Sequence, residues 1–292
     1  MLLVNVGIVI TLSIVLSLLG VRPYMNSYGL DYEQLAIFCL VWGMGGAFMS
    51  LLLSKFIAKM ALGVKVLDPN SHPDARKVHE MVRRASERAG LSKMPELGVY
   101  QSPEINAFAT GPSRRHSLVA VSTGLLSNMD DDAIEGVLGH EVAHIANGDM
   151  VTMTLIQGVM NALVMFVSRI VAHAVSSNQK GERSSSGLYF VTLIACELVL
   201  GLFGVMVTSW FSRHREFRAD AGSARFTSRD KMIRALQALE SRAQGMDPRA
   251  PGLATFKISG KRGRGFLSLI STHPPLSERI EALQRGRFSG NS

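Results

Sequence analysis

Two histidines and a glutamate are the residues best suited to chemistry, and they lie in the stretch His140-Glu141-Val142-Ala143-His144. Residues four apart on a helix share one face, with Cβ atoms about 5–6 Å apart, so both imidazoles can bind one metal ion. Glu141 would lie beside the ion, where a carboxylate suits a general base acting on water. Such a pattern arises by chance in roughly one chain of this length in a hundred. The stretch therefore predicts a zinc hydrolase site.

A catalytic zinc site usually has three protein ligands and one open position, so a third ligand must come from elsewhere in the chain. Glu216 is the candidate, and Asp220 follows it at the spacing of one helical face. We expect Glu216 to bind the ion and Asp220 to accept a hydrogen bond from a ligating imidazole, which would fix its tautomer. His214 is the rival third ligand, although it would project from another side of that helix.

The elements that must position these residues can be read from caps and periodicity. Residues 127–130 offer N-caps for the helix that carries the histidines, and acidic residues follow in its first turns. A helix is expected that opens at Ser71-His72-Pro73 and is ended by Gly90. Two more are expected after the last apolar run, from about Ser228 to Arg242 and near Leu276 to Gln284. Three short runs between them predict a small antiparallel sheet, namely Leu97–Tyr100, Asn106–Thr110 and Ser117–Ser122.

Four apolar runs are long enough to be membrane helices, which agrees with a content of 47% hydrophobic residues and a mean hydropathy of +0.19. The runs are Leu2–Gly20, Leu35–Leu53, Val151–Val167 with an extension to Val175, and Leu188–Trp210. A cleaved signal peptide is the alternative for the first run, but no basic region precedes it. Arg169 and Glu197 interrupt the last two runs. We favour a structural role for Glu197, either protonated or paired, over a functional one.

The basic residues that flank these runs predict the orientation of the chain. One side carries Lys55, Lys59, Lys65, Arg213, Arg215, Arg218, Arg225 and Arg229, and the other carries Arg22, Lys180 and Arg183. Both termini and the polar segments should therefore face the cytoplasm. The net charge of +8 comes without a nucleic-acid-binding module, so a lipid bilayer is the expected partner and nucleic acid is not. Two cysteines, both in apolar runs, exclude a disulfide framework.

With these motifs in place, the chain resembles the HtpX-type membrane metalloproteases, gluzincins related to the CAAX prenyl protease. The resemblance covers nearly the whole sequence. It rests on Asn106-Ala107-Phe108-Ala109, on His140 to His144 with Asn147-Gly148-Asp149, on Ser212-Arg213 through Glu216-Phe217 to Ala219-Asp220, and on Thr272-His273-Pro274-Pro275 with Arg279.

The resemblance implies one Zn²⁺ per subunit, held by His140, His144 and Glu216, with Glu141 and His273 as catalytic residues. It places Arg279 with Asp220 around the ligands. Asn106, Ala107 and Phe108 would form a substrate-binding edge strand, although a turn-capping role for Asn106 stays equally open and core packing is favoured for Phe108. It also implies a multi-pass protein of the bacterial inner membrane that degrades misfolded or damaged membrane proteins under stress.

The expected fold is a mostly α membrane protein with four hydrophobic helices and an α+β zincin-like protease domain. The expected division is residues 1–54 as two membrane helices, 55–150 as the first part of the protease domain, 151–210 as two further membrane helices, and 211–292 as its second part. Two other functions remain as alternatives. A silent membrane scaffold would keep a structural zinc, and a transporter would use Arg169 and Glu197, but four spans without repeated halves disfavour transport.

Overall fold

The computed structural model describes residues 25–26, 29–177, 186–245 and 269–286. The chain divides into two compact units. The first unit comprises the described residues of 1–50 and 153–208, and the second comprises those of 51–152 and 209–292.

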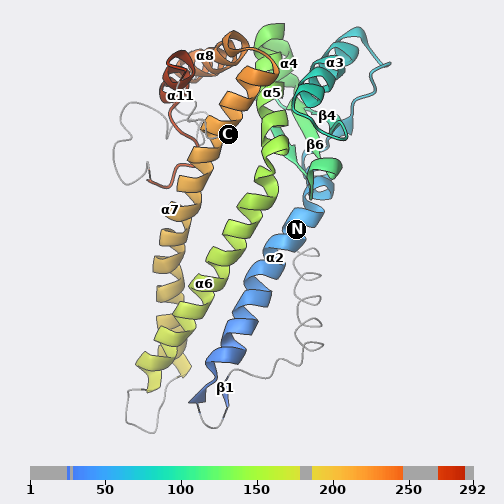
Figure 1. Cartoon of the computed structure of the whole chain (residues 1–292). Helices are drawn as coiled ribbons and strands as arrows, with labels where there is room; N and C mark the ends of the chain where they lie inside the picture. Colours follow the sequence, from blue (N-terminus) through green and yellow to red (C-terminus); the bar gives the residue numbers. More distant parts are fainter. Residues whose placement is uncertain (1–24, 27–28, 178–185, 246–268, 287–292) are drawn as a thin grey trace. The chain divides into compact units, whose positions relative to one another are not determined.

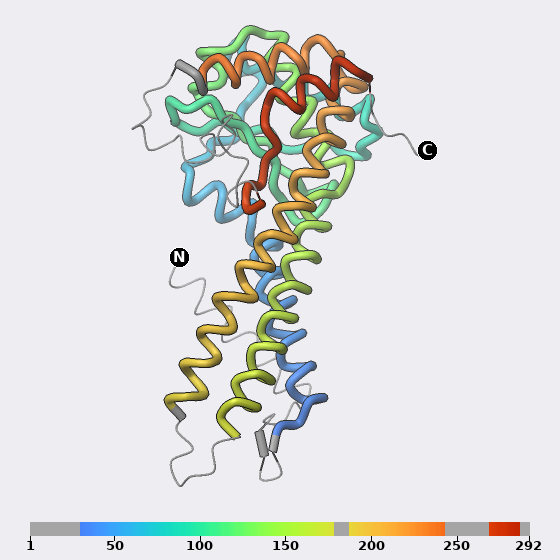
Figure 2. The backbone as a smooth tube through the Cα atoms, turned by 90° about the vertical axis from the view of Figure 1, so that its left-hand side faces the viewer, coloured from blue at the N-terminus to red at the C-terminus, as the bar shows by residue number. Residues whose placement is uncertain are grey.

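The first unit is built from parts of three long helices, which lie side by side in both views (Figures 1 and 2). They are α2 (Tyr32–Leu62), α6 (Asp149–Ser177) and α7 (Ser186–Phe226), and α2 is preceded by a two-stranded hairpin of β1 (Met25–Asn26) and β2 (Gly29–Leu30). All three helices are long and apolar enough to cross a membrane. They contain the second, third and fourth predicted runs, whereas the first run lies outside the described residues.

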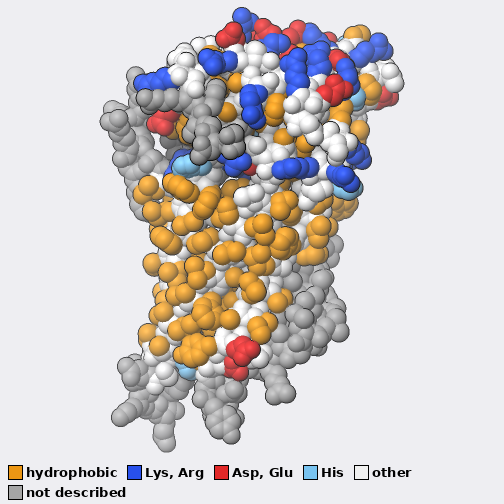
Figure 3. Space-filling model, viewed as in Figure 1, with side chains coloured by type: hydrophobic (Ala, Val, Ile, Leu, Met, Phe, Trp, Pro, Cys, Tyr) orange, Lys and Arg blue, Asp and Glu red, His pale blue; other side chains and the backbone are white. Residues whose placement is uncertain are grey.

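The surface of these helices has the composition expected of a lipid-facing surface. Leu198 and Val199 are 71% and 70% exposed, and hydrophobic side chains cover the visible face of the first unit (Figure 3). Charged side chains gather on the second unit in the same view. Within the first unit, Glu197 forms an ion pair with Arg169, which agrees with the paired role expected for it.

The second unit contains a four-stranded sheet in the order β3 (Lys65–Val66), β4 (Glu96–Tyr100), β6 (Leu118–Ser122) and β5 (Ala107–Thr110). The predicted fold class is confirmed, with one difference in the sheet. β3 pairs with β4 and β5 with β6 in antiparallel fashion, but β4 and β6 are parallel, so the sheet is mixed. The chain leaves β4, forms the edge strand β5, and returns between them as β6.

Helices pack around this sheet and complete the core (Figure 1). They are α3 (Pro73–Arg88), α4 (Thr123–Asn128), α5 (Asp131–Asn147), α8 (Arg229–Gly245) and α11 (Leu276–Gln284), and a short 3-10 helix, η1 (Arg114–His116), precedes β6. Every residue of α5 from Ala133 to Ile145 is buried. The helix begins at the expected cap, since the Asp130 side chain accepts a hydrogen bond from the Ala133 N–H.

Small residues let the C-terminal part of α7 pack directly against α5. A Cβ added at Gly222 would lie 2.6 Å from the Cβ of Ala143, and one added at Gly139 would lie 2.7 Å from the Ser223 hydroxyl oxygen. The Ser223 hydroxyl donates a 2.7 Å hydrogen bond to the carbonyl of Gly136. This close approach brings the side chains of the two helices to one point.

Candidate metal centre and active site

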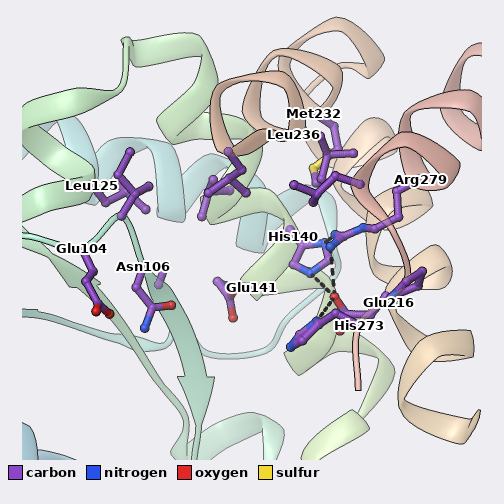
Figure 4. Close-up of a pocket in the computed structure, with 16 residues that line it drawn as sticks. Glu104, Asn106, Leu125, His140, Glu141, Glu216, Met232, Leu236, His273 and Arg279 are labelled. Atoms are coloured by element: carbon purple, nitrogen blue, oxygen red, sulfur yellow. Dashed lines mark hydrogen bonds and ion pairs between the residues drawn. The ribbon is translucent and has the colours of Figure 1, made fainter. Parts of the chain in front are cut away.

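Three buried side chains converge where α5 packs against α7. His140 and His144 project from α5, and Glu216 projects from α7. The two imidazole Nε2 atoms are 3.1 Å apart, and the Glu216 carboxylate oxygens lie 3.6 Å from Nε2 of His140 and 3.4 Å from Nε2 of His144. Figure 4 shows His140 and Glu216 facing each other across this point.

These spacings fit a metal ion. Two ligand atoms about 2.0–2.1 Å from an ion at a tetrahedral angle are separated by about 3.3–3.4 Å. The three observed separations of 3.1, 3.4 and 3.6 Å bracket that value. Two imidazoles and one carboxylate are also a donor set that suits zinc. The cluster of His140, His144 and Glu216 therefore fits a metal site.

Acceptors behind the two histidines orient their rings. The Nδ1 atom of His140 lies 2.9 Å from an Asp220 oxygen, and Nδ1 of His144 lies 2.6 Å from an Asp149 oxygen. Both carboxylates are buried. A proton held on each Nδ1 leaves the Nε2 lone pair directed at the cluster, which is the tautomer that a metal requires.

Arg279 of α11 balances the charge of the acidic residues. Its guanidinium forms two bonds to Asp220, of 2.8 Å from Nε and 2.6 Å from Nη2, and Nη1 lies 3.3 Å from Glu216. The side chain is buried, so these ion pairs are poorly screened. Arg279 thereby fixes Asp220 behind His140, at the position around the ligands that the resemblance implied.

The same contacts set the protonation of the histidines. Burial alone would lower the pKa of His140, but its hydrogen bonds to Asp220 and Glu216 outweigh burial and raise the pKa to about 9. Burial and the neighbouring His140 would also lower the pKa of His144, yet its bonds to Asp149 and Glu216 raise it above its usual value. A metal ion that binds these nitrogens must therefore displace protons.

A cavity of about 210 Å³ opens beside the cluster and brings the other predicted residues together. Glu141 lines it and points into the space between Asn106 and His140 (Figure 4). His273 lines it from the loop before α11, with its Nδ1 atom 3.1 Å from a Glu216 oxygen. A carboxylate for proton transfer and a histidine thus border the same space as the ligand cluster.

The predicted edge-strand residues divide between the cavity and the core. Asn106 and Ala107 line the cavity, whereas the Phe108 ring packs against Tyr100, 5.7 Å between centroids. Core packing, the role favoured for Phe108 from the sequence, is its observed environment. The rival ligand His214 is exposed and contacts Trp210, outside the ligand cluster.

The β5 strand presents an unpaired edge, since β6 is its only partner among the described strands. The Ser122 N–H donates to the Asn106 carbonyl, 2.9 Å away. Hydrogen bonds alternate along an antiparallel pair, so the Phe108 backbone groups also point to β6. Those of Ala107 and Ala109 consequently point to the open edge, where they are available to an extended peptide.

Sequence reasoning did not assign two parts of this site. Asp149 was noted only as part of a motif, yet it holds His144 because Gly148, with φ of +74°, turns the chain back between α5 and α6. A glycine that ends a helix just before an acid was the available indication. The apolar wall of the cavity was also missed, because it combines Leu125 of α4 with Met232 and Leu236 of α8.

Comparisons with known proteins agree with this geometry. The model of "Peptidase family M48" matches residues 72–287. A "Protease HtpX homolog" of Methylacidiphilum infernorum is 47% identical over 97% of this chain and 96% of its own length, and one of Bacillus licheniformis is 48% identical over 97% of both. A "Protease HtpX" of Xanthomonas axonopodis pv. citri is 48% identical over 97% of this chain and 95% of its own.

The crystal structure of S. mikatae Ste24p has a similar fold, with a TM-score of 0.61 at 17% identity over 86% of this chain and 58% of that one. At this identity the likeness concerns the fold alone. The family model, by contrast, spans the histidines, Glu216 and Arg279 together. The helices are apolar enough to span a membrane, the buried cluster fits a metal, and the relatives are similar over nearly their full length. The chain therefore belongs to peptidase family M48, among its HtpX-type membrane proteases.

Proposed function

We propose that this membrane peptidase is a zinc-dependent endopeptidase of the bacterial inner membrane that hydrolyses peptide bonds in misfolded or damaged membrane proteins. One Zn²⁺ per subunit would be held by His140, His144 and Glu216. The observation that carries the proposal is the position of Glu141, whose carboxylate lines the same cavity as the ligand cluster without belonging to it.

The residues of the chain divide the chemistry among them. A bound zinc ion would supply Lewis acidity toward the scissile carbonyl and lower the pKa of an attacking water. Glu141 takes the proton of that water and later gives it to the leaving amine. His273, which lines the cavity, donates a hydrogen bond to the oxyanion that develops on the carbonyl. Asp149, Asp220 and Arg279 hold the ligands in position.

The substrate backbone would be held by β5. An extended peptide that adds to the open edge pairs with the Ala107 backbone beside Glu141. The Asn106 side chain, directly before β5, contacts the same peptide. The apolar side of the cavity, formed by Leu125, Met232 and Leu236, then receives one of its side chains. This arrangement supports endopeptidase action, because strand addition requires an extended stretch of chain and no free terminus.

The order of elements along the chain supports a substrate in or near the bilayer. α6 begins at Asp149, beside His144, and continues into an apolar span, while Glu216 follows the other apolar span on α7. Basic residues gather at the ends of these spans that adjoin the catalytic segments, which favours a cytoplasm-facing site. Membrane proteins with cytoplasmic loops are therefore the proposed substrates.

The test uses purified full-length protein in nanodiscs with an unfolded model substrate. We expect a chelator to abolish cleavage and stoichiometric Zn²⁺ to restore it, and His144→Ala to lose both zinc and cleavage. Asp131→Asn, an exposed acid at the start of α5, is the control and should retain both. A silent scaffold with structural zinc predicts zinc in the wild-type protein without any chelator-sensitive cleavage, and that result would overturn the proposal.

A further inference from the structure

The first unit contains a cavity of about 540 Å³ between α2, α6 and α7, separate from the cavity that contains Glu141. Its wall includes four polar side chains, namely Gln157, Asn161, Arg169 and Glu197. The helices around it are apolar enough to cross a membrane. Polar and ionisable groups at such positions are costly in lipid, and their usual roles are in binding or transport.

The charged part of this wall is incompletely bonded. Arg169 Nη1 donates to the Met165 carbonyl at 3.1 Å and lies 3.3 Å from a Glu197 oxygen, and the guanidinium lies 5.7 Å from the centre of the Phe38 ring. Arg169 Nε, however, is buried and has no hydrogen-bond partner among the described residues. An unpaired buried donor of a charged group is expensive, so the helices that form this wall do not fully satisfy its polar groups.

The neutral part of the wall can supply both a donor and an acceptor. Gln157 donates a 2.9 Å hydrogen bond to the side-chain oxygen of Asn161, which leaves the Asn161 amide nitrogen and the Gln157 oxygen without a partner in the described part of the chain. Glu197 adds a carboxylate. An amide or hydroxyl side chain can donate and accept at once, whereas an anionic phosphate would meet the charge of Glu197.

Glycines on two helices leave room for such a group. A Cβ added at Gly46 of α2 or at Gly201 of α7 would have no atom within 4 Å. Gly43 differs, since a Cβ there would lie 2.5 Å from the Ala162 nitrogen, so that glycine serves the contact between α2 and α6. Small residues on a membrane helix allow a further helix to approach closely. Gly46 and Gly201 are both part of the cavity wall.

We propose that this cavity binds a polar side chain carried by a transmembrane segment of the substrate. The proposal rests on the proposed function and adds a way in which the peptidase would select damaged membrane proteins as substrates. A folded membrane protein pairs its intramembrane polar groups internally, whereas a damaged one presents them to lipid. A site with unpaired donors and acceptors would retain the damaged segment and so raise the rate at which its loops are cut.

The binding test uses Glu141→Gln protein in nanodiscs, so that a bound substrate is not cut. Two single-span substrates differ only in a central Asn or Leu. A benzophenone amino acid replaces Gly201 in the cavity or, as the matched control, Gly187, which lies on the same helix outside the cavity and also has free space. We expect about three- to thirty-fold more crosslinking of the Asn substrate than of the Leu substrate from position 201, and no preference from 187.

Equal crosslinking of both substrates from position 201 would overturn the proposal. Crosslinks only to lipid, or only to residues 2–20 of the same chain, would also overturn it, because another occupant would then fill the cavity. A second measurement uses Gly201→Leu, which fills the space, with Gly187→Leu as control. The ratio of Asn-substrate to Leu-substrate cleavage should fall toward one in the Gly201 variant and stay at the wild-type value in the control.

The two proposals fail in different ways. If the wild-type protein cleaves neither substrate while position 201 still prefers the Asn segment, the proposed proteolysis is wrong and the cavity site stands. If the wild-type protein cleaves both substrates at equal rates and the crosslinks show no preference, the proteolysis stands and the cavity site is wrong.

Discussion

Replacing Asp149 tests how the site orients its ligands. Asp149 is 4% exposed, and its carboxylate lies 2.6 Å from His144 Nδ1. A hydrogen bond to a charged acceptor is about twice as strong as one to a neutral acceptor. Asp149→Asn should therefore lose about 1–1.5 kcal/mol of zinc binding, or about tenfold in Kd. Asp149→Ala leaves the ring N–H without a partner and should lose about a hundredfold.

The assay is competition for zinc between the purified protein and a fluorescent chelator at fixed pH. Asp131→Asn is the matched control, because Asp131 starts α5 but is exposed and forms a surface ion pair with Lys77. We expect the control to bind zinc as the wild type does. Wild-type zinc affinity in both Asp149 variants, or an equal loss of affinity in the control, would show that Asp149 does not orient His144 for the metal.

Three further predictions concern the edge strand, the helix contact and pH. Ala107→Pro removes a backbone donor from the open edge of β5 and should raise KM about two- to tenfold. Ala109→Pro is the control, because Ala109 lies outside the cavity wall, and it should raise KM less. Gly222→Val places atoms against α5 and should destabilise the protein by about 1–3 kcal/mol, measured by thermal unfolding, with Gly187→Val as control. Because the pKa of His140 is raised to about 9, zinc affinity should fall as pH decreases below that value, about tenfold per unit for each proton displaced.

The protonation of His140 also makes the stability of the metal-free protein depend on pH, in the direction opposite to that of zinc affinity. The raised pKa of His140 means that the folded, metal-free protein binds a proton more tightly than the unfolded chain. This contribution to stability is fully present below about pH 6.5 and is lost as pH rises through about 9. Metal-free protein should therefore unfold more easily as pH rises across this interval. Stability that increases with pH there would contradict the contacts with Asp220 and Glu216.

The remaining predictions fail under distinct results. An Ala109→Pro variant with the larger KM would show that the peptide does not pair beside the cavity. A Gly222→Val variant as stable as the control would show that α5 and α7 have more room than 2.6 Å between Cβ positions allows.

Local sequence patterns predict much of this structure. α11 covers the predicted Leu276–Gln284. α3 lies within the predicted helix, which opens at Ser71-His72-Pro73 and is ended by Gly90, whose φ is +68°. Such boundaries depend on caps and side-chain periodicity, which are local properties of the chain. The spacing of the two histidines is local as well, because one helical turn separates them.

Features that join distant segments were harder to predict. The parallel pairing of β4 with β6 depends on β5 lying at the edge, and no local pattern sets strand direction. The bonds from Arg279 to Asp220 unite α11 with α7, and only the family resemblance placed that arginine near the site. Asp149 was missed because its position depends on the left-handed turn at Gly148, beyond the helix that carries the histidines.

The most direct test of the central claim is the Glu141→Gln variant, with zinc content and proteolysis measured on the same preparation. The substitution keeps the size of the side chain and removes the base, and Glu141 lies outside the ligand cluster. We expect one zinc ion per chain at wild-type affinity and the loss of cleavage of an unfolded substrate. Cleavage at the wild-type rate by the zinc-loaded variant would contradict the role of Glu141 as the base.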